Sequence, residues 1–232
     1  MLYDAVIVGG GQSAACAAGA LRDAGYTGEL TIIGDEEYHP YERPPLSKDL
    51  LTGRTEIQST YVRPVPWYKD SNVNICLGAR VLKIDRQSKS VLLSTGDHVP
   101  YGALLLATGA RPRILPGLPP GPTVFYLRTI NDTLALRSAL TPGKRVAVIG
   151  AGFIGSEIAA AARKSKCEVV VFETALHVLA RVAPNLIGNY VRQIHEREGV
   201  QLHLSCTVKD TRVTNTCEIT LRVCSESSSR IA

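Results

Sequence analysis

Apolar residues near the start of the chain fall in short runs that end at glycine. Residues 3–8 form such a run and predict a strand, and Gly9 follows it directly. The next residues favour a helix that ends near Gly25, and residues 29–33 predict a second strand. This order of elements is typical of a parallel sheet with helices packed on it.

The same pattern returns in the second half of the chain. Residues 145–149 predict a strand, residues 156–163 a helix, and residues 168–172 a second strand. A further helix is expected over residues 184–198, where Gly199 ends it. Because the pattern occurs twice, the sequence predicts an α/β protein with two Rossmann-like lobes.

The stretch between the two repeats is rich in β-forming residues. Strands at 73–75, 80–85 and 90–93, followed by a turn at Gly96, predict a small β-meander inserted in the first lobe. Residues 103–107 predict a strand that returns to the first sheet. The first lobe is therefore expected to end soon after this strand.

Proline and glycine are frequent over residues 111–143, which predicts a connection between lobes with one helix near residues 132–140. Strands near residues 200–204, 207–213 and 218–223 are expected to complete the second lobe. The expected boundaries are 1–110 for the first lobe, 111–143 for the crossing segment, 144–224 for the second lobe and 225–232 for a disordered tail.

Each repeat carries a glycine-rich turn between its first strand and its helix. The first N–H groups of a helix have no intrahelical partner and, with the helix dipole, attract anions such as pyrophosphate. In such turns the first glycine permits the tight turn, the second lets the backbone approach phosphate, and the third position allows close helix packing. The candidates are Gly9, Gly11 and Ala14 in the first turn, where alanine replaces the third glycine, and Gly150, Gly152, Ile154 and Gly155 in the second.

An acidic residue ends the second strand of each repeat, where a dinucleotide ribose would lie. In the first repeat we choose Asp35, with Glu36 as the alternative. In the second repeat the residue is Glu173, and no arginine follows it directly. A 2′-phosphate would meet Glu173 without a neutralising charge, so the sequence favours NADH over NADPH.

A segment with paired prolines lies at residues 41–51. The prolines predict an extended approach, and Leu46 with Ser47 can start a short helix whose first turn carries Lys48. The alternative is a proline-ordered surface loop with solvated charges, and the residues alone favour that alternative.

Composition changes this picture little. The formal charge of +5 on 232 residues is spread along the chain, which gives little support to a nucleic-acid partner, and we expect none. A solvated surface accounts for the charge, with an acidic protein partner as the alternative. No apolar run reaches the roughly 18 to 20 residues that cross a bilayer. No basic stretch precedes the first apolar run, so we expect no signal leader. We therefore expect a cytoplasmic protein without a membrane partner.

The cysteines show neither C-x-x-C pairing nor the spacing of metal ligands. We expect reduced thiols that pack as small hydrophobes, and no metal site. They are Cys16, Cys76, Cys167, Cys206, Cys217 and Cys224.

Four motifs in chain order resemble those of the FAD-dependent NADH:ferredoxin or rubredoxin reductases, which serve aromatic-ring dioxygenases and cytochrome monooxygenases. They are the first glycine turn, residues 41–48, residues 107–109 and the second glycine turn through Glu157. The resemblance implies a pyridine nucleotide-disulfide oxidoreductase-like fold in which the first lobe binds FAD and the second binds NAD. It also implies a ferredoxin or rubredoxin as the electron acceptor.

The resemblance further implies roles for individual residues. Ser13 and Asp35 would contact FAD through its phosphates and ribose, and Val81 would meet the adenine end through its backbone. Further cofactor-binding candidates from the family motifs are Arg43, Thr108, Gly109 and Arg128.

For Lys48 the resemblance reverses the surface-loop interpretation. It implies that Lys48 and Glu157 meet as a buried catalytic pair near N5 of the flavin, where NADH delivers its hydride before single electrons pass to an iron–sulfur partner. Glu157, just inside a helix N-terminus, is expected to stay ionised. A disulfide reductase would need a redox cysteine pair near residues 41–48, and a peroxidase one cysteine there; that segment contains none.

Members of that family continue after the NAD lobe with a return to the FAD sheet and an interface domain. The pattern is lost after about Asn215, so we expect a C-terminally truncated chain with an incomplete FAD lobe and an unpaired sheet edge. Two hypotheses follow: a reductase that binds FAD and NADH, or an inactive fragment that only binds nucleotide.

Overall fold

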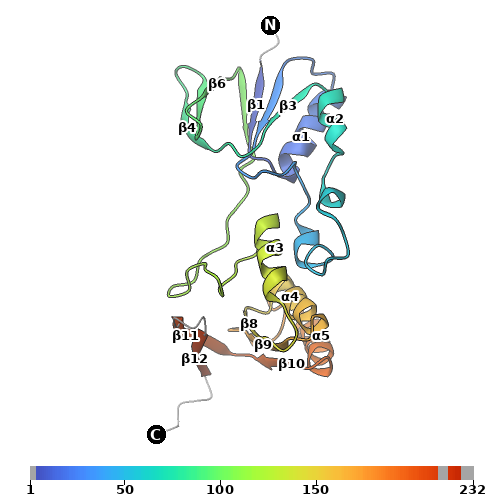
Figure 1. The fold of residues 1–232 in the computed structure, drawn as a ribbon, viewed down its shortest axis with the longest axis vertical. Helices are drawn as coiled ribbons and strands as arrows, with labels where there is room; N and C mark the ends of the chain where they lie inside the picture. The colour runs from blue at the N-terminus through green and yellow to red at the C-terminus, as the bar shows by residue number, and fades with distance from the viewer. Residues whose placement is uncertain (1–3, 214–218, 226–232) are drawn as a thin grey trace. The chain divides into compact units, whose positions relative to one another are not determined.

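The computed structural model describes residues 4–213 and 219–225, and the chain forms two compact units (Figure 1). The first unit consists of Met1–Arg43 and Glu56–Arg111, and the second of Pro44–Thr55 and Pro112–Ala232. The short segment Pro44–Thr55, here called the strap, therefore groups with the second unit although its sequence lies inside the first.

The first unit is built on a four-stranded parallel sheet with the order β3-β2-β1-β7. On β1, Ala5 lies opposite Leu30 of β2 and Ala103 of β7. The elements of this part are β1 (Ala5–Val8), α1 (Gln12–Asp23), β2 (Leu30–Ile33), η2 (Ile57–Thr60), α2 (Val65–Asp70), β3 (Val73–Cys76) and β7 (Ala103–Leu106).

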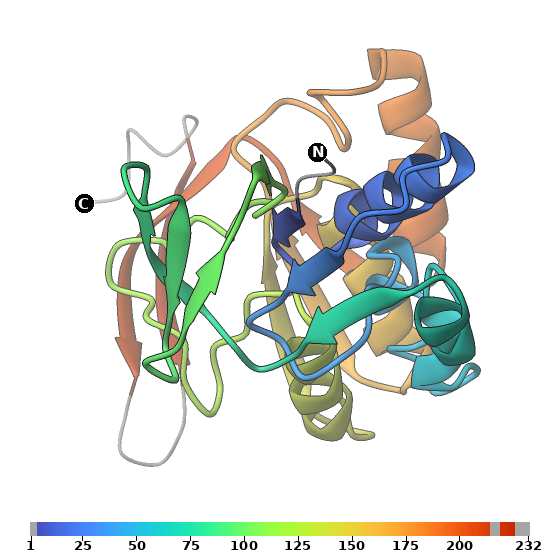
Figure 2. The same cartoon turned by 90° about the horizontal axis from the view of Figure 1, so that it is seen from above.

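The two faces of this sheet bury different partners, because successive side chains of a strand point to opposite sides. Ile7 and Ile32 pack with Ala14, Ala18 and Tyr68 of the two helices. The opposite face, which carries Val6, Val8 and Ile33, packs against a small antiparallel sheet. Figure 2 shows α1 and α2 on one side of the blue strands and the green antiparallel strands on the other side.

The antiparallel sheet consists of β4 (Val81–Asp85), β5 (Ser90–Leu93) and β6 (His98–Pro100). It confirms a meander in the first lobe but corrects its membership, because β3 pairs in parallel with β2. A short apolar run predicts a strand but does not reveal its partner, which explains the error.

The second unit repeats the strand–helix–strand arrangement with a three-stranded parallel sheet of order β10-β9-β8. A two-stranded antiparallel sheet of β11 and β12 follows it. The elements are α3 (Ile130–Ala139), β8 (Arg145–Ile149), α4 (Phe153–Lys164), β9 (Glu168–Phe172), α5 (Asn185–Arg197), β10 (Val200–His203), β11 (Cys206–Val213) and β12 (Ile219–Ser225). Of the expected disordered tail, Ser225 belongs to β12 and the rest lies outside the described residues.

Two helix starts differ from the sequence-based expectation. The strap begins with η1 (Pro44–Ser47), so Lys48 follows the helical turn instead of lying in it. Proline fits a first helical turn because its fixed φ suits it and its missing N–H has no partner to lose. In the second unit α4 begins at Phe153, three residues earlier than expected, with Gly152 as its N-cap.

No helix within residues 4–213 and 219–225 combines the length and apolar character needed to cross a membrane. The cysteines of this part of the chain are free. Cys167 and Cys206 are buried as expected, but Cys16 is exposed, because it lies on the outer side of α1. Cys217 lies outside the described residues.

Candidate functional site: two glycine turns and a charged pair

The first glycine turn connects β1 to α1. Gly9 has a φ of +118°, and a Cβ there would lie 2.1 Å from the carbonyl oxygen of Ala107. Only glycine fits this position without a backbone shift. A Cβ on Gly11 would meet no atom within 4 Å, and Ala14, in the place of the third glycine, is fully buried.

The second glycine turn connects β8 to α4. Gly150 has a φ of +102°, and a Cβ on Gly152 would meet no atom within 4 Å. At Gly155 a Cβ would lie 1.9 Å from the carbonyl oxygen of Gly150, so the helix passes directly against the turn. Ile154 is the second residue of α4, and its side chain is exposed.

Both turns have the properties of a phosphate site. Gly11 and Gly152 are the N-caps of α1 and α4, and neither helix has a side-chain hydrogen bond at its cap. The first-turn N–H groups of a helix then remain available to an anion, and the dipole favours negative charge. Because the space beside both N-cap glycines is open, the residues present fit a pyrophosphate at each turn.

Glu173 is tied directly to the second glycine turn. Its Oε2 accepts a hydrogen bond of 2.6 Å from the N–H of Ala151, and its Oε1 accepts bonds from the Ala175 N–H at 2.8 Å and the Thr174 hydroxyl at 3.1 Å. Partial burial opposes ionisation, but these hydrogen bonds outweigh it and hold the pKa of Glu173 below its ordinary value. The carboxylate is thus fixed beside the turn as an anionic acceptor.

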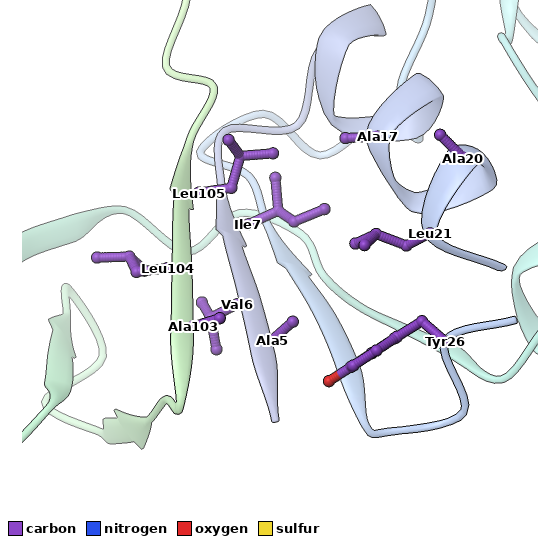
Figure 3. Close-up of a pocket in the computed structure, with 10 residues that line it drawn as sticks. All are labelled: Ala5, Val6, Ile7, Ala17, Ala20, Leu21, Tyr26, Ala103, Leu104 and Leu105. Carbon is purple, nitrogen blue, oxygen red and sulfur yellow. The ribbon is translucent and has the colours of Figure 1, made fainter. Parts of the chain in front are cut away.

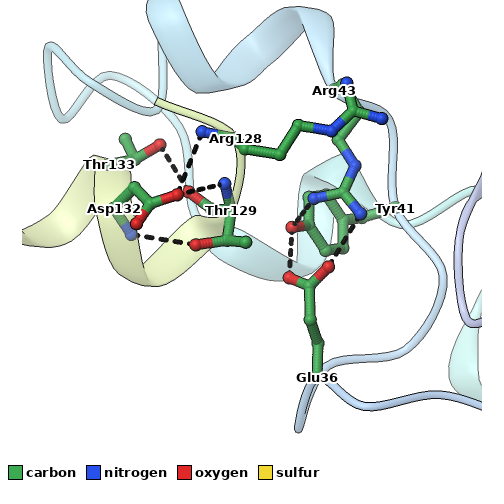
Figure 4. A network of polar contacts seen from close by, with 7 residues as sticks. All are labelled: Glu36, Tyr41, Arg43, Arg128, Thr129, Asp132 and Thr133. Atoms are coloured by element: carbon green, nitrogen blue, oxygen red, sulfur yellow. Dashed lines mark hydrogen bonds and ion pairs between the residues drawn. The ribbon is translucent and has the colours of Figure 1, made fainter. Parts of the chain in front are cut away.

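The acidic residues after β2 are arranged differently. Asp35 is exposed, whereas Glu36 takes part in a local network with Tyr41 and Arg43 (Figure 4). Glu36 Oε2 accepts a 2.5 Å hydrogen bond from the Tyr41 hydroxyl, and Glu36 Oε1 lies 2.7 Å from Nη2 of Arg43. Arg43 also donates to the Tyr41 hydroxyl. No local pattern predicted this network, which engages the alternative Glu36 and leaves Asp35 facing solvent.

The structure brings Lys48 and Glu157 together inside the second unit. Lys48 Nζ lies 2.9 Å from Glu157 Oε1, and the Ser47 hydroxyl donates to Glu157 Oε2. The expected burial of the pair is wrong, because half of the Lys48 side chain is exposed. Glu157 is also the fifth residue of α4. The helix dipole acts most strongly in the first turn, and Glu157 lies just beyond that turn.

The remaining candidates lie on separate elements of the two units. Ser13 is an exposed residue of the first turn of α1, and Val81 begins β4. Thr108 and Gly109 follow β7, and the Thr108 nitrogen borders the position that a Cβ on Gly9 would take. The Arg128 N–H donates to Asp132 at the start of α3, beside the capping box of Thr129 and Asp132 (Figure 4).

An apolar hollow in the first unit has a different character from these sites. Figure 3 shows its lining side chains from β1, β7 and α1, with the Tyr26 hydroxyl as their one polar group. Within the described residues β7 pairs with β1 alone, and Leu105 and Leu106 are exposed. The hollow therefore marks an open edge of the sheet and offers nothing that would bind a phosphate.

Comparisons with known proteins agree with this geometry. A family model described as pyridine nucleotide-disulphide oxidoreductase matches residues 3–231. The chain is 41% identical over 201 residues to the ferredoxin–NAD(+) reductase component of the anthranilate 1,2-dioxygenase system of Burkholderia cepacia, covering 86% of this chain and 50% of that protein. It is 41% identical over 207 residues to rhodocoxin reductase of Rhodococcus erythropolis, covering 88% and 48%.

A solved structure shows the same fold. A chain of the covalent putidaredoxin reductase–putidaredoxin complex superposes with a TM-score of 0.89 at 33% identity, covering 95% of this chain and 54% of that one. The chain spans about half the length of the curated relatives it matches.

Proposed function

Because the chain belongs to the pyridine nucleotide-disulphide oxidoreductase family, we propose that its two glycine turns bind two dinucleotides, FAD at the first turn and NADH at the second. The observation that carries this proposal is the repetition of one device: each turn ends at a helix without a side-chain cap, with open space beside its N-cap glycine. In this proposal the protein is a flavoprotein reductase of the cytoplasm.

In this proposal each lobe contributes its own acceptors. Residues 1–110, apart from the strap that groups with the second unit, form the FAD lobe, in which Ser13, Asp35 and Val81 contact the cofactor. Further contacts are Arg43, Thr108 and Gly109, together with Arg128 from the crossing segment 111–143. Residues 144–224 form the NAD lobe, in which Glu173 binds the adenosine ribose. Its fixed negative charge favours NADH, because a 2′-phosphate would be repelled.

When bound, FAD would accept hydride from NADH and release single electrons to a ferredoxin or rubredoxin-type partner. In this proposal Lys48 and Glu157 would serve the hydride step, since their ion pair supplies a positive and a negative group side by side. The names of the relatives support electron transfer to a ferredoxin-type partner, since one is a ferredoxin–NAD(+) reductase component and another is rhodocoxin reductase.

The experiment is reconstitution of the full chain with FAD, followed by anaerobic addition of NADH. A yellow protein whose flavin absorbance is bleached by NADH supports the reductase. A protein that binds NADH but retains no flavin contradicts it and indicates a nucleotide-binding module without turnover.

Lys48→Met tests the proposed charged pair. Loss of the ammonium group should slow flavin reduction by NADH about two- to fivefold, because a half-exposed ion pair is worth roughly 0.2–1 kcal/mol. Stopped-flow absorbance measures this rate. An unchanged rate and an unchanged flavin potential would remove Lys48 from the proposed site.

A further inference from the structure

The carboxylate of Glu157 is held by two neighbouring residues of the strap. The Ser47 hydroxyl donates to Oε2, while Lys48 Nζ lies 2.9 Å from Oε1. Ser47 and Glu157 are 110 positions apart in the chain. Each carboxylate oxygen therefore has its own partner, and together the two contacts fix the orientation of the group.

The two contacts differ in their surroundings. Ser47 is 5% exposed, whereas the Lys48 side chain is 50% exposed. An exposed ion pair is weak and is screened by salt, and a lysine side chain moves readily between partners. A buried hydroxyl is confined to the partner it has, because breaking that bond leaves it without water. Ser47 is therefore the contact that fixes Glu157.

The position of Ser47 is set by contacts that do not involve Glu157. The buried Thr133 hydroxyl of α3 can donate to the Leu46 carbonyl oxygen, at 3.2 Å, or to the Thr129 carbonyl oxygen of its own helix, at 3.1 Å. Leu51 is buried in the core of the second unit. The strap is thus anchored on both sides of Ser47, which is presented to α4 as a fixed donor.

We propose that Ser47 is a positioning residue: it fixes the Glu157 carboxylate, and Glu157 in turn holds the Lys48 ammonium group in one place. Its consequence for hydride transfer rests on the proposed function of Lys48 and Glu157. The arrangement itself is a property of the second unit and is measurable without nucleotide.

The first test is the rate at which formaldehyde and borohydride methylate Lys48 in the nucleotide-free chain, followed by peptide mass spectrometry. Ser47→Ala should raise this rate about threefold relative to Lys164, an exposed lysine on the same helix as Glu157, because the freed carboxylate holds the ammonium group less of the time. In a Glu157→Gln background Ser47→Ala should add nothing.

Thr133→Val is the matched control, because it removes a buried hydroxyl bond to the same strap without touching Glu157. It should raise the Lys48 rate less than Ser47→Ala does, because the Ser47 hydroxyl that bonds Glu157 is retained. Equal acceleration in Thr133→Val and Ser47→Ala would overturn the proposal, since the strap as a whole would then be responsible, and so would an unchanged rate in Ser47→Ala.

A second readout is flavin reduction in the FAD-loaded chain. Ser47→Ala should slow reduction about twofold, less than Lys48→Met does, with little change in the NADH dissociation constant, because Ser47 acts through the Lys48–Glu157 pair. If the wild-type chain shows no flavin reduction, the proposed function fails while the methylation result still decides the role of Ser47. Normal reduction combined with a wild-type methylation rate in Ser47→Ala would refute the positioning role alone.

Discussion

The two glycine turns share a motif but use glycine for different reasons. In the first turn the crowded position is Gly9, which faces the Ala107 carbonyl after β7. In the second turn the space at Gly150 is open, and the crowded position is Gly155, against the turn's own carbonyl. The first turn is thus crowded by the segment after β7, and the second by its own helix. Since the helix does not crowd the first turn, its third position accommodates the methyl group of Ala14.

The acidic residues extend this contrast. Glu173 is bonded to the Ala151 N–H inside its own turn, whereas Glu36 is engaged by Tyr41 and Arg43, and Asp35 faces solvent. In the second unit one set of contacts orders both the turn and the ribose acceptor. In the first unit Glu36 is ordered by Tyr41 and Arg43 and not by the glycine turn. Substitutions in that network and substitutions in the turn should therefore have separate effects on cofactor binding.

The largest effect is expected at the crowded glycines. Gly155→Ala and Gly9→Ala should each lower the free energy of unfolding by about 3 kcal/mol. The new methyl group would overlap a backbone carbonyl, which cannot move aside as a flexible side chain can. Urea denaturation followed by circular dichroism measures this change. Gly152→Ala is the control, with a cost below about 1 kcal/mol. If Gly152→Ala and Gly155→Ala lowered the free energy of unfolding equally, the proposed difference between the open and the crowded glycine position would be wrong.

The next effect concerns the fixed carboxylate. Glu173→Ala should weaken NADH binding by roughly 1.5–3 kcal/mol, the value of charged hydrogen bonds, as measured by calorimetry. Glu168→Ala, at the other end of β9, is the control and should leave binding unchanged. An unaltered dissociation constant in Glu173→Ala would exclude the proposed ribose contact.

The same residue predicts a dependence of stability on pH. Because the pKa of Glu173 is lower in the folded chain than its ordinary value of 4.5, its contribution to stability is present above that value. It is lost as the pH falls through the lower folded value. The stability difference between wild type and Glu173→Ala should therefore shrink below about pH 4. A difference that grows on acidification would contradict the assigned direction of the shift.

The smallest effect is expected at the third position of the first turn. Ala14→Gly should cost about 1 kcal/mol, because glycine loses more backbone entropy in a helix and leaves a small gap in the packing. Thermal unfolding measures the change. A cost as large as that of Gly155→Ala would show that the two third positions have the same role.

Local patterns in the sequence predicted the elements around both turns well. The apolar runs that became β8 and β9 have the expected bounds, and α1 ends just before Gly25. What the sequence did not show depends on contacts between distant segments. Pairing of β3 with β2 and docking of the strap on the second unit arise from packing that no local pattern encodes.

The site shows the same division. The spacing of the glycines and the placement of Glu173 follow from the strand–turn–helix motif. The contact of Lys48 with Glu157 came only from the family resemblance, and Ser47 was missed as their partner. A serine beside a lysine carries no signal of its own, because its role depends on a residue on another helix.

The most direct test of the central claim is calorimetric titration of FAD and NADH into the wild type, Gly11→Ala and Gly152→Ala. Both substitutions fill open space, so they should block phosphate approach while the fold is kept. The account predicts that the wild type binds one FAD and one NADH together, that Gly11→Ala loses FAD alone, and that Gly152→Ala loses NADH alone. Competition between FAD and NADH for a single turn would contradict it.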